Sequence, residues 1–146
     1  MISYIVDSIS IGRMTDAAKS LTESFQFKSI LNVGIVDAER PNSGVFKNIP
    51  EFIHYENIPL HDEEEISFKK LDSLADKVKE LEKPLLVNCV GGLNRSVAVV
   101  CAYLMKHKKM SLRKALQLIA EKRFIELRLP IMESLEKFEK QIARNK

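Results

Sequence analysis

The sequence is poor in the residues that mark several classes of protein. It has two cysteines among 146 residues, too few for a disulfide framework, so we expect free thiols in a reducing compartment, the cytoplasm. No apolar run approaches the roughly 20 residues that cross a bilayer. The opening MISYIVDSIS carries an early aspartate and no basic segment of the kind that begins a signal peptide. No repeat, low-complexity stretch or linker interrupts the chain, which predicts one domain over residues 1–146.

The charge pattern is equally unspecialised. The formal net charge is +3, and lysines and glutamates are interspersed, as is typical of a solvated surface. No basic stretch is interleaved with aromatic residues, so we do not expect nucleic acid as a partner. The three histidines, His54, His61 and His107, show no metal-ligand spacing. We therefore expect neither a metal ion nor an organic cofactor.

Short apolar runs alternate with amphipathic segments along the chain. The segment SYIVDSISIG alternates apolar and polar residues around a turn at Asp7–Ser8, which predicts two short strands or a hairpin. Further strands are expected within 28–34, 52–60 and 85–87, and helices within 14–25 (Thr15 as N-cap), 66–81, 95–109, from Ser111 (as N-cap), and after Pro130. This order predicts an α/β domain with a central mixed, mainly parallel sheet flanked by helices.

The stretch LLVNCVGGLNRSVAVVCAYLM (85–105) places a short glycine-bearing turn between a buried strand and an apolar helix. Glycines allow successive backbone N–H groups to point inward and bind an anion, and the start of a helix adds positive potential. Arg95 offers a planar fork to two phosphate oxygens, and the same positive environment favours the thiolate of Cys89. The spacing therefore predicts a phosphate site with a nucleophile beneath it. Its phosphate-binding loop would comprise Val90, Gly91, Gly92, Leu93, Asn94 and Arg95. The simpler alternative is a packed cysteine and a surface arginine.

This turn resembles the signature of the cysteine-dependent protein tyrosine phosphatases, and within them of the dual-specificity phosphatases. Their pattern is His-Cys-x2-Gly-x2-Arg-Ser/Thr, and this chain has asparagine, Asn88, in place of the histidine and Ser96 after the arginine. YIVDSISIGRMTDAAKSL, ILNVG and AYLMKHKKMSLRKALQLI extend the similarity over roughly residues 2 to 122.

The resemblance implies a role for each matching residue. Cys89 would attack phosphorus to form a cysteinyl-phosphate, Arg95 and the loop amides would bind the phosphate, and Ser96 would assist the second step. Asn32 and Asn88 would support the loop. Asp62, within NIPLHDEEEISF, would be the general acid and then the general base, with Glu63 or Glu64 as replacements.

Several alternatives stay open at this point. Because Asn88 carries no charge, we expect the Cys89 thiolate to form less readily than is typical of the family, with slower chemistry in acid. The leading function is hydrolysis of phosphotyrosine, and of phosphoserine and phosphothreonine, on a phosphoprotein. The alternatives are a phosphate-binding adaptor without turnover and an RNA 5′-triphosphatase, since GLNR also resembles the loop of that branch. The uncharged loop disfavours inositol phospholipids.

Four further expectations concern residues outside the loop and the assembly of the chain. Cys101 is expected to be a packed thiol, His61 is a candidate for the wall of the site, and Arg40 is a candidate for contact with acidic residues of the substrate. A monomer is favoured.

Overall fold

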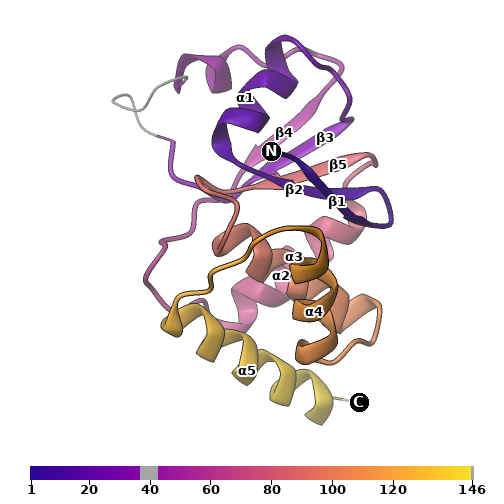
Figure 1. Cartoon of the computed structure of the whole chain (residues 1–146), viewed down its shortest axis with the longest axis vertical. Helices are drawn as coiled ribbons and strands as arrows, with labels where there is room; N and C mark the ends of the chain where they lie inside the picture. The colour runs from indigo at the N-terminus through magenta and orange to yellow at the C-terminus, as the bar shows by residue number, and fades with distance from the viewer. Residues whose placement is uncertain (37–42, 146) are drawn as a thin grey trace.

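The computed structural model describes residues 1–36 and 43–145, which form a five-stranded sheet with helices on both faces (Figure 1). The strands lie in the order β1-β2-β5-β3-β4. The pair β1–β2 is antiparallel and the other pairs are parallel. The predicted α/β class, with a mixed and mainly parallel sheet, is therefore confirmed. The strands are β1 (Ser3–Val6), β2 (Ile9–Gly12), β3 (Ser29–Asn32), β4 (His54–Asn57) and β5 (Leu85–Asn88).

The register of the parallel strands brings their carboxyl ends to one edge of the sheet. Asn88, the last residue of β5, pairs with Gly12 at the end of β2 and with Asn32 at the end of β3. Asn32 in turn pairs with Asn57 at the end of β4. Ligands of such sheets bind beyond this edge, so the turn that follows β5 leaves the sheet at its functional side.

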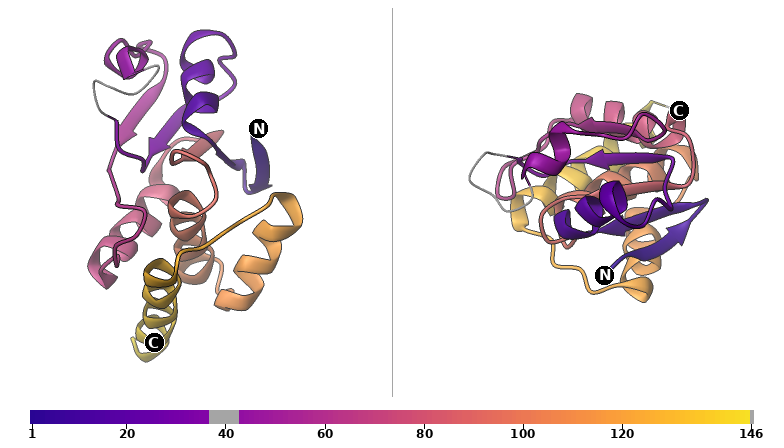
Figure 2. Two further views of the ribbon diagram at one scale, coloured as in Figure 1. Left: turned by 60° about the vertical axis from the view of Figure 1, so that its left-hand side comes forward. Right: turned by 90° about the horizontal axis from the view of Figure 1, so that it is seen from above.

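The helices divide between the two faces of the sheet. In Figures 1 and 2, α1 and the short 3-10 helix η1 lie on one side of the sheet, and α2 to α5 lie on the other. The first face buries a small apolar cluster that includes Leu21, Ile30 and Leu86. The second face buries the main core. The helical segments are α1 (Met14–Thr22), η1 (Ser43–Lys47), α2 (Phe68–Glu80), α3 (Arg95–His107), α4 (Leu112–Lys122) and α5 (Leu129–Arg144).

Helix α3 is the centre of the main core, and this fixes where the turn after β5 must go. Every residue of α3 from Arg95 to Met105 is buried, as the apolar sequence of this segment predicts. A helix surrounded by β5, α2, α4 and α5 has little freedom to shift, so the loop at its start is held on a rigid element. Within the part of the chain that the structure describes, none of the helices is long and apolar enough to cross a membrane.

The helix starts show one correct and one wrong prediction. Ser111 caps α4 as predicted, because its hydroxyl accepts a hydrogen bond from the backbone N–H of Lys114 at 3.1 Å. The prediction of Thr15 as the cap of α1 is wrong: the N-cap is Arg13, and Thr15 lies inside the helix. The chain turns into α1 directly after β2, and the Asp16 carboxylate reaches back to accept from the Arg13 backbone N–H at 2.8 Å. Asp16 thus accepts from the N–H of the N-cap residue, as the third residue of a capping box does, whereas a capping hydroxyl would accept from an N–H of the first turn.

Candidate active site

The loop from Cys89 to Asn94 curls around the sulfur of its own first residue. The backbone N–H of Gly92 points at Cys89 Sγ with N···S at 3.2 Å, and the Ser96 hydroxyl oxygen lies 3.2 Å from the same sulfur. Gly92 has φ of +69°, and a Cβ at this position would lie 2.8 Å from the carbonyl oxygen of Gly12. Only glycine fits this conformation and this space without a shift of backbone.

The sulfur lies at the buried base of the loop, and Arg95 lies beside it. Cys89 is 2% exposed and Arg95 is 6% exposed. Arg95 NH1 donates to the Leu60 carbonyl at 2.9 Å, and its Nε lies 3.5 Å from Asp62 Oδ1. These contacts hold the guanidinium group in one orientation at the start of α3. The structure therefore brings the Cys89 thiol, the Arg95 guanidinium group and the inward N–H of Gly92 to one place.

Asn94, the last residue of the loop, connects three segments of the chain. Its side-chain amide donates to the Asp62 carbonyl at 2.8 Å and to Asp62 Oδ1 at 2.7 Å. Its amide oxygen accepts from the Arg128 backbone N–H at 2.9 Å. Asn94 is the N-cap of α3, but its side chain makes no capping hydrogen bond. It instead ties the loop to the Asp62 segment and to the connection between α4 and α5.

A pair of buried amides lies beneath the loop. Asn32 Oδ1 accepts from the Gly34 backbone N–H at 2.9 Å and from Asn88 Nδ2 at 3.0 Å. Because a backbone N–H can only donate, Asn32 must present its oxygen here, and Asn88 must therefore present its NH₂ group. Asn88 Nδ2 also lies 3.3 Å from the Cys89 carbonyl oxygen. Asn88 thus contacts the backbone of the loop, and its own side-chain oxygen has no partner among the described residues.

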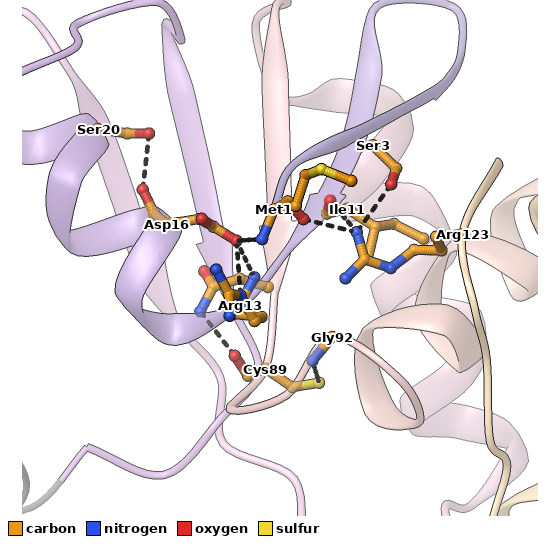
Figure 3. Close-up of polar contacts among 10 residues, drawn as sticks. Met1, Ser3, Ile11, Arg13, Asp16, Ser20, Cys89, Gly92 and Arg123 are labelled. Atoms are coloured by element: carbon orange, nitrogen blue, oxygen red, sulfur yellow. Dashed lines mark hydrogen bonds and ion pairs between the residues drawn. The ribbon is translucent and has the colours of Figure 1, made fainter.

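Other segments hold the outer side of the loop. The Val90 carbonyl accepts from the Met14 N–H at 3.0 Å, and the Leu93 carbonyl accepts from the Glu126 N–H at 3.0 Å. Behind Gly92 lies Arg123, the C-cap residue that follows α4 (Figure 3). The start of α1 and the connection after α4 therefore both fix the loop.

The loop opens into a cleft of about 570 Å³. Seven of the residues expected to form the site line it, together with Glu63 and Glu64, the alternative acids, and His61, the candidate for the wall of the site. The seven are Asp62, Cys89, Val90, Gly91, Leu93, Asn94 and Arg95. Gly92 and Ser96 contact the sulfur, and Asn32 and Asn88 lie under the loop.

Three lining residues were not expected from the sequence: Ile35, Glu126 and Arg128. They come from loops without a periodic pattern, and no local signal distinguishes them.

Two other expectations have different outcomes. Cys101 is a fully buried free thiol in α3, and burial raises its pKa well above the ordinary value, so it is the packed residue that was expected. Arg40 lies outside the described residues. Over residues 1–36 and 43–145, no group of three or more His, Cys, Asp or Glu side chains could hold a metal ion.

Comparison of the chain with known proteins identifies relatives in one family. The family model described as dual specificity phosphatase, catalytic domain, matches residues 9–141. Dual specificity protein phosphatase 1B of Arabidopsis thaliana is 30% identical over 147 residues, which cover 99% of this chain and 85% of that protein.

A viral relative and a solved structure agree with this match. Dual specificity protein phosphatase OPG106 of variola virus is 29% identical over 115 residues, 76% of this chain and 63% of the viral protein. The chain thus matches less than two thirds of the length of this viral relative. The crystal structure of human DUSP28 has the same fold, with a TM-score of 0.79 at 21% identity over 97% of this chain and 95% of that one. The chain therefore belongs to the dual specificity phosphatase family.

Proposed function

We propose that the chain is a protein phosphatase that hydrolyses phosphate monoesters through a cysteinyl-phosphate intermediate, with its catalytic domain formed by residues 1–146. The observation that carries the proposal is the placement of Cys89 Sγ at the base of the cleft. Arg95, an inward backbone N–H and the Ser96 hydroxyl surround it, and Asp62 lies across from it. A phosphate seated on the loop would have the sulfur beneath it, in line for attack.

In the first step the Cys89 thiolate attacks phosphorus and forms an S–P bond, while the P–O bond to the substrate breaks. The oxygen that leaves takes a proton from the Asp62 carboxyl group. Loop N–H groups and the Arg95 guanidinium carry the charge of the transferred phosphoryl group, because their dipoles and charge are already oriented toward it. The products of this step are the dephosphorylated substrate and phosphocysteine.

In the second step a water molecule attacks the phosphocysteine, and the Asp62 carboxylate accepts its proton. The S–P bond breaks, inorganic phosphate is released, and the thiolate of Cys89 forms again. The Ser96 hydroxyl, 3.2 Å from the sulfur, stabilises the thiolate as it leaves. These two steps need no metal ion and no organic cofactor, because Cys89 supplies the nucleophile and Arg95 supplies the positive charge.

The charge around the cleft favours a phosphoprotein as the substrate. Glu63, Glu64 and Glu126 line the cleft, and Arg128 lies 3.9 Å from Glu63. The loop itself carries no lysine. This acidic wall repels a ligand with several phosphates, such as a triphosphate RNA end or an inositol polyphosphate head group, more than a single phosphorylated side chain. A single phosphate on tyrosine, and on serine or threonine, is the ligand that matches the one arginine of the loop, Arg95.

The first test is hydrolysis of para-nitrophenyl phosphate by the wild type and by Cys89→Ser without added metal. We expect turnover in the wild type, none in Cys89→Ser, and a phosphocysteine at residue 89 in acid-quenched protein by mass spectrometry. Ser96→Ala should increase the fraction of protein trapped as this intermediate, because it slows the second step.

A folded wild-type protein that gives no turnover and no phosphocysteine would contradict the proposal that the chain is an enzyme. Phosphopeptide binding by the same protein would then support the adaptor, which the uncharged Asn88 favours. Release of the γ-phosphate from triphosphate-ended RNA, faster than hydrolysis of phosphopeptides, would contradict the choice of substrate.

A further inference from the structure

A second arginine reaches the loop from the side that faces away from the cleft. Arg123 NH1 donates to the carbonyl oxygens of Met1 and Ile11 at 3.1 and 2.8 Å and to Ser3 Oγ at 3.1 Å (Figure 3). Its NH2 lies 2.7 Å from the position where a Cβ on Gly92 would stand. Arg123 does not line the cleft. The guanidinium group therefore packs against the residue whose N–H points at the Cys89 sulfur.

The positive charge of this arginine is not neutralised by its immediate partners. The three groups that accept its hydrogen bonds are all neutral oxygens, and its Nε is buried without a partner among the described residues. The ion pairs of residues 1–36 and 43–145 do not include Arg123. A guanidinium group keeps its proton in proteins, so the charge persists in this half-buried place.

The charged groups that face Arg123 come from three elements. Asp16 and Arg13 lie at the start of α1, the terminal ammonium group of Met1 pairs with Asp16 at 3.1 Å, and Cys89 begins the loop. Burial lowers the pKa of Arg123, whereas Asp16 and Cys89 act to raise it and Arg13 adds to the lowering. Asp16 already accepts hydrogen bonds from Arg13 and from the ammonium group. Besides Asp16, the group whose negative charge acts on Arg123 is Cys89, as its thiolate.

We propose that Arg123 stabilises the thiolate of Cys89 from behind the phosphate-binding loop. The inference rests on the proposed role of Cys89 as the nucleophile. On the cleft side, Arg95 also favours the thiolate and the Asp62 carboxylate opposes it. Asn88, immediately before the cysteine, adds no charge. Arg123 touches neither substrate nor sulfur in this arrangement, so it acts electrostatically and as a support for Gly92.

The test measures the thiolate directly rather than through turnover. The rate at which iodoacetamide alkylates Cys89 is followed against pH, with Cys89→Ser as the background from Cys101. In Arg123→Met, which keeps most of the apolar stem, the midpoint of this curve should move up by about one pH unit, the lower end of the range for a nearby opposite charge. Arg123→Lys should restore part of the shift. Alkylation needs no turnover, so a failure of the proposed function would not be mistaken for a failure of this inference.

A second variant with the opposite expected sign separates electrostatics from structural damage. Asp16→Asn removes the carboxylate nearest to Arg123 and should move the midpoint to lower pH. An unchanged midpoint in folded Arg123→Met would overturn the inference, as would an unchanged or raised midpoint in Asp16→Asn. If thermal unfolding shows that Arg123→Met does not fold, the other two variants decide the question. The midpoint should then rise by less than about one pH unit in Arg123→Lys and fall in Asp16→Asn.

Discussion

Replacement of Asn94 by alanine should separate the supply of a proton from the binding of phosphate. The change removes three hydrogen bonds: two to Asp62, at 2.8 and 2.7 Å, and one from the Arg128 N–H at 2.9 Å. The two that involve backbone contribute about 1 kcal/mol each to stability. Since the Asp62 side chain is half exposed, we give its charged bond less weight than a buried one. The free energy of unfolding should fall by about 2–3 kcal/mol.

The effect on rate follows from the proposed role of Asp62. A positioned general acid contributes roughly 10²–10⁴-fold to rate, and loss of its main anchor should remove about 10- to 100-fold of this. The loss should depend on the leaving group. An aryl phosphate whose phenol is acidic leaves without a proton, so its kcat should change by less than about threefold, whereas phenyl phosphate should show the full loss.

The assay is kcat and kcat/KM for both esters in the wild type, Asn94→Ala and Asp62→Asn. Asn57→Ala is a matched control, because its amide also joins two loops, through the carbonyls of Asn32 and Gly34, without contact to Asp62. Asn94→Ala should repeat the leaving-group dependence of Asp62→Asn, and Asn57→Ala should not. Equal losses on both esters would refute the reasoning, because the amide would then act through the phosphate site and not through the acid.

Two further predictions concern the loop and the packing of α2 on α3. Gly92→Ala should lower kcat/KM for para-nitrophenyl phosphate by at least about tenfold, since φ of +69° costs about 1–2 kcal/mol and the new Cβ meets the Gly12 carbonyl. Gly91→Ala is the control, because its Cβ would meet only the Leu93 side chain at 3.8 Å; equal losses in the two variants would contradict the steric argument. The pKa of Asp76 is lowered, first by its hydrogen bond from Lys106 and also by His107, although burial opposes this. A lowered pKa in the folded state stabilises the folded protein at pH values above the pKa of the unfolded state, about 4, and this stabilisation is lost as the pH falls through the folded-state pKa. Asp76→Asn should therefore be less stable than the wild type above about pH 5, and the two urea midpoints should converge as the pH falls below about 4. A difference between the midpoints that persists at the acid end would exclude this linkage.

The fold could be predicted from the sequence because its signals are local and periodic. The apolar face from Ile66 to Leu81, the apolar segment from Arg95 onward and the short runs before Asn32 and Asn88 each identify their element without knowledge of the rest. The turn after β5 was equally local, since its cysteine, glycines and arginine lie within seven residues. The predicted roles of these residues, and of Asp62 and Ser96, stay predictions until the variants above are measured.

What the sequence did not reveal depends on contacts between distant segments. The partners of Arg123 are 112 to 122 residues away in the chain, and Asn94 reaches Asp62 and Arg128 over 32 and 34 residues. No spacing rule connects such positions, and each residue type is common on surfaces. The wrong cap at Thr15 has a related cause. A threonine near a helix start is a good statistical signal, but here the helix begins at Met14, directly after β2, so Thr15 lies inside its first turn and Asp16 accepts from the Arg13 N–H.

The ion pair between Arg95 and Asp62 connects substrate binding to the proposed chemistry. In the free protein the Asp62 carboxylate lies 3.5 Å from Arg95 Nε, a donor that a bound phosphate would also use. A phosphate dianion competes for this arginine with more charge than a carboxylate has, and so displaces Asp62 from it. We therefore expect the binding of substrate to free the Asp62 side chain from Arg95 for its proposed role, while Asn94 keeps the Asp62 backbone at the rim of the cleft.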